Sequence, residues 1–142
     1  PIRHCLVKRI RCVLDKVFGY GDIAYEAKFP LICNREGYVS VLTKVKGMSR
    51  ALDTTVEYVK KTATDVENGY ALIAHSNREL YANTLKEKLE GEMSFKKVFV
   101  TDVFSGCGAN IGPGMIGVYY LGNKVSDDLT LEKEIMNQIV GK

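Results

Sequence analysis

The sequence predicts an α/β (α+β) fold, a two-layer sandwich in which helices cover a mixed β-sheet. Segments with helical periodicity alternate with short apolar runs typical of strands, which gives roughly five strands and four helices. Two of the strand-like runs flank a short loop at 34–37, and such a hairpin argues against a purely parallel sheet. The chain has 142 residues, a length that suits one domain or one lobe of a larger protein.

The composition is that of a soluble globular protein, with 46% hydrophobic and 26% charged residues. The net charge of +3 is small, and its basic excess is concentrated in the first sixteen residues. No aromatic-interleaved basic motif accompanies it, so we expect no nucleic-acid partner. No apolar run reaches the roughly 18 residues of a spanning helix, and no signal peptide is visible. We therefore expect a cytoplasmic protein without membrane insertion.

The four cysteines form no CxxC pair and no Cys/His metal spacing. They are interpreted as reduced thiols, in keeping with the cytoplasm. The chain begins with Pro1 and not with methionine, which indicates processing or a fragment of a longer protein.

The first segment predicts an amphipathic helix over 3–18, because its apolar residues recur at helical spacing: Leu6, Ile10, Val13, Leu14 and Val17. We assign 1–26 to a helical N-terminal segment whose apolar face needs a partner, either this domain's core or a missing one. The single domain then covers 1–142.

The next segments predict a β-hairpin from the runs 27–33 and 38–45. Pro30 has no N–H to donate, so we expect it at a strand start or on an edge strand. Ser49 is predicted to cap a helix that runs to about Thr64.

In the second half, the run 70–74 predicts a buried strand. Ser76 to Glu79 matches a capping box at the start of the following helix. Two further strands are predicted over 95–104 and 115–121, and a last helix over about 129–140. Asp127 and Asp128 place negative charge at the start of this helix.

The run from Ser105 to Gly114 is rich in glycine and separates the last two predicted strands. It is either a tight turn into a core strand or a loop whose bare N–H groups meet a carboxylate or phosphate. It enters a strand and no Gly-Lys-Ser/Thr follows, so it is neither a P-loop nor a dinucleotide fingerprint.

Candidate catalytic groups are few. His75 at a strand end is a general base, a ligand or a satisfied structural histidine. Cys107 lies in the glycine run, but no histidine is near it in the sequence. The pair Asp127 and Asp128 is interpreted as a helix start and not as a metal site. We predict a binding protein without catalytic activity, cofactor or metal.

The stretch from Asn110 to Gly122 closely resembles the C-terminal signature of the DegV family, a His- or Asn-x-Gly-Pro-Gly loop followed by an apolar strand. Further resemblances follow in the family's order: Phe29-Pro30-Leu31-Ile32, Asn34-Arg35-Glu36-Gly37, Lys44-Val45-Lys46-Gly47 and, more weakly, Leu6-Val7-Lys8-Arg9-Ile10. The chain is similar to the C-terminal half of these proteins, and the resemblance implies that the segment 1–26 links to a missing N-terminal lobe.

The resemblance implies a bacterial fatty-acid-binding protein in which two α/β lobes enclose one long-chain acid. It implies that the carboxylate lies at the glycine loop and that the acyl chain lies in an apolar tunnel. The lipid-binding residues implied in this chain are Asn110, Ile111, Gly112, Gly114, Met115, Phe104 and Arg9. Ile116 and Val118 line the tunnel or simply pack in the core. The hydroxyl ligands of the N-terminal lobe are not in this chain.

The resemblance also implies, for some members, a fatty acid kinase subunit as partner. Asn110 stands where those members have histidine, and its amide cannot carry charge. Lys46 replaces an arginine and loses the planar bidentate geometry. Both departures argue against the kinase partner. The alternative function is a non-catalytic interaction lobe that forms a homodimer or packs on a partner lobe, because a tunnel wall without its other half is exposed apolar surface.

Overall fold

The computed structural model describes residues 2–8, 27–33, 39–103 and 114–141, with side chains for 40–103 and 114–141. The elements follow in the order β1 (Ile2–Lys8), β2 (Ala27–Cys33), β3 (Val39–Val41), β4 (Val45–Lys46), α2 (Met48–Thr62), the 3₁₀ helix η2 (Val66–Asn68), β5 (Tyr70–His75), α3 (Glu79–Glu92), β6 (Lys97–Asp102), β7 (Ile116–Leu121) and α5 (Thr130–Val140).

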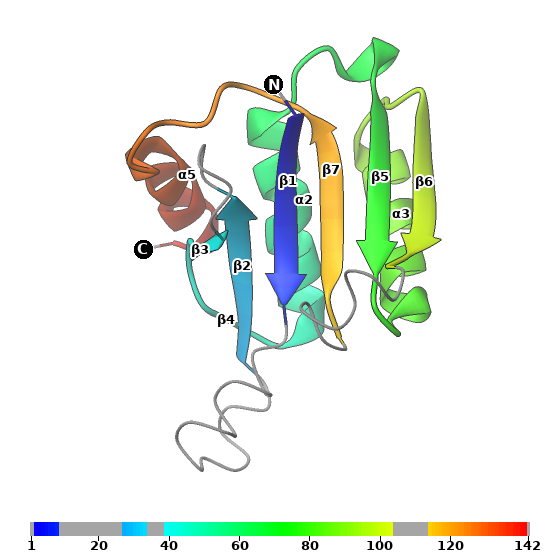
Figure 1. Ribbon diagram of the computed structural model, residues 1–142, viewed down its shortest axis with the longest axis horizontal. Helices are drawn as coiled ribbons and strands as arrows, with labels where there is room; N and C mark the ends of the chain where they lie inside the picture. The colour runs from blue at the N-terminus through cyan, green and yellow to red at the C-terminus, as the bar shows by residue number, and fades with distance from the viewer. Residues whose placement is uncertain (1, 9–26, 34–38, 104–113, 142) are drawn as a thin grey trace.

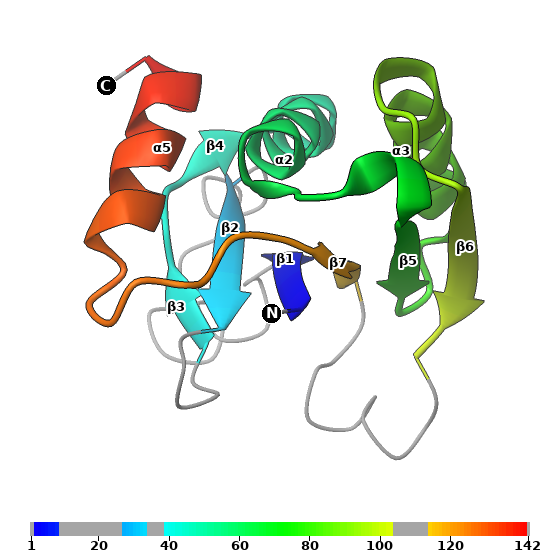
Figure 2. The same ribbon diagram turned by 90° about the horizontal axis from the view of Figure 1, so that it is seen from above.

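The strands form one mixed sheet in the order β3-β2-β1-β7-β5-β6, and β4 also pairs with β2. Among the described strands, β5 and β6 are the only parallel pair, and the other pairs are antiparallel. Figures 1 and 2 show that α2, α3 and α5 all lie on the same face of this sheet. We call this the covered face and the opposite one the open face. The predicted fold class, helices on a mixed sheet, is confirmed.

The main core lies between the covered face and the two helices α2 and α3. The predicted apolar stripe of α2 supplies Leu52, Val56 and Val59, which are at most 1% exposed. The rest of this cluster comes from α3 and from alternate positions of the strands: Ala82, Leu85, Leu89, Ala71, Ile73, Val98, Ile116, Val118 and Tyr120. Alternation places these strand residues on one face, as the pleat requires.

The helix predicted over 3–18 is wrong for residues 3–8, which belong to β1. β1 lies between β2 and β7, and Val7 is opposite both Pro30 and Ile116. A strand with two neighbours pairs its backbone on both sides, which outweighs a local helical periodicity. Residues 9–18, on which that periodicity largely depended, lie outside the described residues.

The hairpin is confirmed, because β2 and β3 are antiparallel, but its second strand is split. Val41 is opposite Leu31 and Val45 is opposite Lys28, so 42–44 span the same length as 29–30. This one-residue offset is that of a β-bulge. Pro30 lies in the middle of β2, an inner strand, opposite the break between β3 and β4. The expectation of a strand start or an edge was therefore wrong, and the broken neighbour accommodates the missing N–H instead.

Both predicted serine caps were wrong. The N-cap of α2 is Gly47, with φ of 81°, and α2 begins before Ser49. The N-cap of α3 is Arg78, and no side chain caps this helix. Likewise, the strand predicted as buried, now β5, exposes 51% of Tyr70 and 38% of Leu72 on the open face.

The start of α5 is confirmed as predicted. The Asp128 carboxylate accepts hydrogen bonds from the Thr130 hydroxyl at 2.6 Å and from the Thr130 N–H at 3.1 Å. Two residues into the helix, the buried carboxylate of Glu132 accepts from the N–H and hydroxyl of Ser126. These bonds attach the segment after β7 to α5. Among the described residues, no helix is long and apolar enough to cross a membrane.

Candidate functional site

The glycine run enters β7 at one edge of the sheet, which we call the loop edge. The parallel strands β5 and β6 end there, and the antiparallel β7 begins there, because His75 is opposite both Asp102 and Ile116. β1 ends at the same edge, where Val7 is also opposite Ile116. In Figure 1 this is the lower edge of the sheet. Three strand ends therefore surround the base of the loop.

Ser76 ties the end of the glycine run to the segment between β5 and α3. Its N–H donates to the Met115 carbonyl at 2.9 Å, and its hydroxyl oxygen accepts from the Met115 N–H at 3.0 Å. Its carbonyl accepts from the Gly114 N–H at 2.9 Å. Sequence reasoning missed this role, because the partners are 39 residues apart and the local pattern matched a helix cap.

Gly114 has a φ of 88°, a region in which side chains are strained. Its N–H is already paired with Ser76, so what Gly114 contributes is its backbone conformation. Met115, the next residue, is 1% exposed. The junction between the loop and β7 is thus buried, hydrogen-bonded and dependent on glycine.

His75 lies next to this junction and is 5% exposed. Its Nδ1 accepts from the Arg78 N–H at 3.3 Å and lies 3.4 Å from the exposed Asp102 carboxylate. The bond from Arg78 ties the buried imidazole to the start of α3, which is the geometry of a structural histidine. This matches the structural alternative considered for His75.

Arg78 is a residue that sequence reasoning missed. It follows His75 and Ser76 directly, and its guanidinium Nε is buried without a hydrogen-bond partner in the described part of the chain. A buried N–H without a partner is costly, and a bound water or ion is one explanation for such a group. Its charge next to the loop edge favours an anion.

Two helices begin at the loop edge. Three residues separate the end of β5 from the start of α3. α2 follows β4, which pairs with the first residues of β2, Ala27 and Lys28, close to the end of β1. Figure 1 shows both helices running away from this edge. The positive ends of both helix dipoles are therefore directed toward it, and they stabilise negative charge.

The predicted site residues divide into three groups. Gly114 and Met115 lie at the loop edge, as described above. Ile116 and Val118 belong to the main core, so of the two alternatives, tunnel lining or core packing, they follow core packing. The others lie outside the described residues: Arg9, Phe104, Cys107, Asn110, Ile111 and Gly112. Within the described ranges, no group of three or more His, Cys, Asp or Glu side chains is arranged to hold a metal.

The chain matches a family model over residues 29–123, a model described as an uncharacterised protein of the DegV family. Among curated proteins, it is 25% identical over 91 residues to a DegV domain-containing protein of Caldanaerobacter subterraneus, an alignment that covers 64% of this chain and 32% of the relative. The chain thus spans about a third of the length of that relative.

Similar solved structures include a DegV family protein from Ruminococcus gnavus with vaccenic acid, with a TM-score of 0.70 and 21% identity over 83% of this chain and 44% of the other. The Streptococcus pneumoniae fatty acid kinase B3 protein loaded with linoleic acid matches with a TM-score of 0.68 and 14% identity, over 86% of this chain and 45% of the other. At these identities the likeness shows the fold.

Proposed function

Because the chain belongs to the DegV family, we propose that it is one lobe of a cytoplasmic bacterial protein that binds a long-chain fatty acid, with the carboxylate at the loop edge. The observation that carries the proposal is the buried junction of Ser76 with Gly114 and Met115, next to two helix N-termini. An anchored glycine loop beside positive helix ends suits a carboxylate. Vaccenic and linoleic acids in the similar structures indicate the ligand class.

Within this proposal, the carboxylate accepts hydrogen bonds from Asn110 and from the amides of Ile111 and Gly112. Gly114 supplies the bend that returns the chain to β7, since its own N–H donates to Ser76. Arg9 and Arg78 add positive charge. The role of Arg78 is supported by its Nε, which is buried and has no hydrogen-bond partner among the described residues.

Phe104 and Met115 form the start of the acyl tunnel in this proposal. On the open face next to the loop edge, Ala74 is opposite Gly117, so the sheet presents almost no side chain there. Leu72 and Tyr119 follow at the next open-face positions. This gives a flat apolar floor for an acyl chain. The chain spans less than half of the similar structures, so the opposite wall belongs to a partner lobe.

The proposal assigns binding and presentation to this protein and no catalysis, cofactor or metal. Likeness to the Streptococcus pneumoniae kinase B3 protein supports a kinase subunit as a further partner. Asn110 gives the carboxylate a neutral donor. We therefore expect retention of the acid to be the main activity and phosphorylation by a kinase subunit to be weak.

The test is mass spectrometry of the acid released when the whole protein is denatured. We expect about one long-chain acid per protein, about C14 to C18, a length that the resemblance implies. Absence of any bound acid, together with no binding of added vaccenic acid, would contradict the proposal.

A matched pair of variants locates the site. Gly114→Ala forces a side chain into a positive-φ conformation and strains the loop junction by about 1–3 kcal/mol. Gly91→Ala in α3 adds a methyl group where nothing lies within 4 Å, and alanine favours the helix by up to about 1 kcal/mol. We expect Gly114→Ala to lose bound acid and Gly91→Ala to retain it. Equal retention would place the acid elsewhere.

A further inference from the structure

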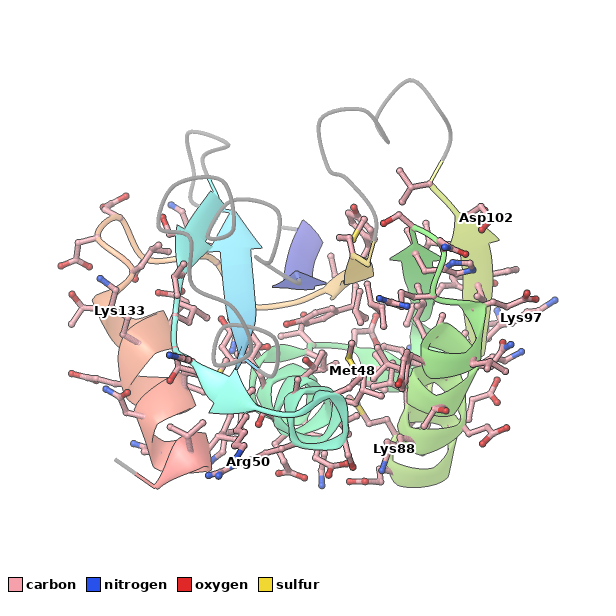
Figure 3. The ribbon with its side chains drawn as sticks, turned by 90° about the horizontal axis from the view of Figure 1, so that it is seen from below. Met48, Arg50, Lys88, Lys97, Asp102 and Lys133 are labelled. Carbon is pink, nitrogen blue, oxygen red and sulfur yellow. The ribbon has the colours of Figure 1, made fainter. Side chains whose placement is uncertain are left out.

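We draw no further inference here: the strongest candidate, the exposed apolar corner of the open face where the Lys97 ammonium lies over the ring of Phe99 beside Tyr70 (Figure 3), carries none because nothing in the described part of the chain shows what covers it.

Discussion

The two faces of the sheet have similar strands and very different surroundings. On the covered face, Ile73, Val98, Ile116 and Val118 are at most 1% exposed. Four apolar side chains at the alternate, open-face positions of β5, β6 and β7 remain 38–51% exposed: Tyr70, Leu72, Phe99 and Leu121. The difference lies in α2, α3 and α5, the helices of the described residues, which all lie on the covered face. When a strand is apolar on both faces, one face can belong to the core and the other to a surface that binds a partner.

The largest expected effect comes from truncating a leucine on each side of the sheet. Leu85→Ala removes a fully buried side chain of α3 and should lower the free energy of unfolding by about 2–5 kcal/mol. Leu72→Ala on the open face should cost at most about 1 kcal/mol. Urea denaturation measures both. Equal losses would mean that the open face is buried in solution as deeply as the core.

A smaller effect is expected from a hydroxyl buried under the helices. The hydroxyls of Tyr120 and Thr62 are 2.7 Å apart and link β7 to α2. Tyr120→Phe should lower the free energy of unfolding by about 1 kcal/mol, because the bond is lost in a buried site. Tyr70→Phe on the open face is the control and should stay within about 0.5 kcal/mol of the unmodified chain. A larger loss in the control would show that the open face depends on polar contacts as well.

The smallest effect concerns the outermost helix of the covered face. The Thr130 hydroxyl and N–H hold the pKa of Asp128 below its ordinary value of 3.8, because both bonds favour the charged carboxylate. When a carboxyl group has a lower pKa in the folded than in the unfolded chain, its ionised form stabilises the fold. This stabilisation is fully present above the unfolded-state pKa and is lost as the pH falls through the folded-state pKa. The stability difference between the unmodified chain and Asp128→Asn should therefore shrink with acidification. Urea midpoints measured from neutral pH downward check this, and a constant difference would contradict it.

Local patterns predicted most elements from α2 onward. The stripe of Leu52, Val56 and Val59, the strands now called β5, β6 and β7, and the acidic start of α5 all have local physical causes. The glycine run was recognised as a special loop because glycine and proline exclude regular structure. Gly114, with its positive φ, bears this out within the described residues.

The errors share one physical reason, which is competition from distant residues. Ser76 matched a helix cap locally, but its hydroxyl is used by Met115 from another strand. Pro30 was expected on an edge, but its neighbouring strand is broken opposite it. Tyr70 and Leu72 were expected to be buried, but no helix among the described residues covers their side of the sheet.

By itself, the sequence determined the class of the fold, the position of the glycine loop and the family resemblance, because periodicity, backbone restriction and short motifs act over a few residues. The tertiary structure alone decided that residues 2–8 form a strand between two others, that Ser76 anchors the loop and that the helices of the described residues all lie on one face of the sheet. Hydrogen-bond partners and burial depend on which segments meet in space, and the order of residues along the chain does not fix this.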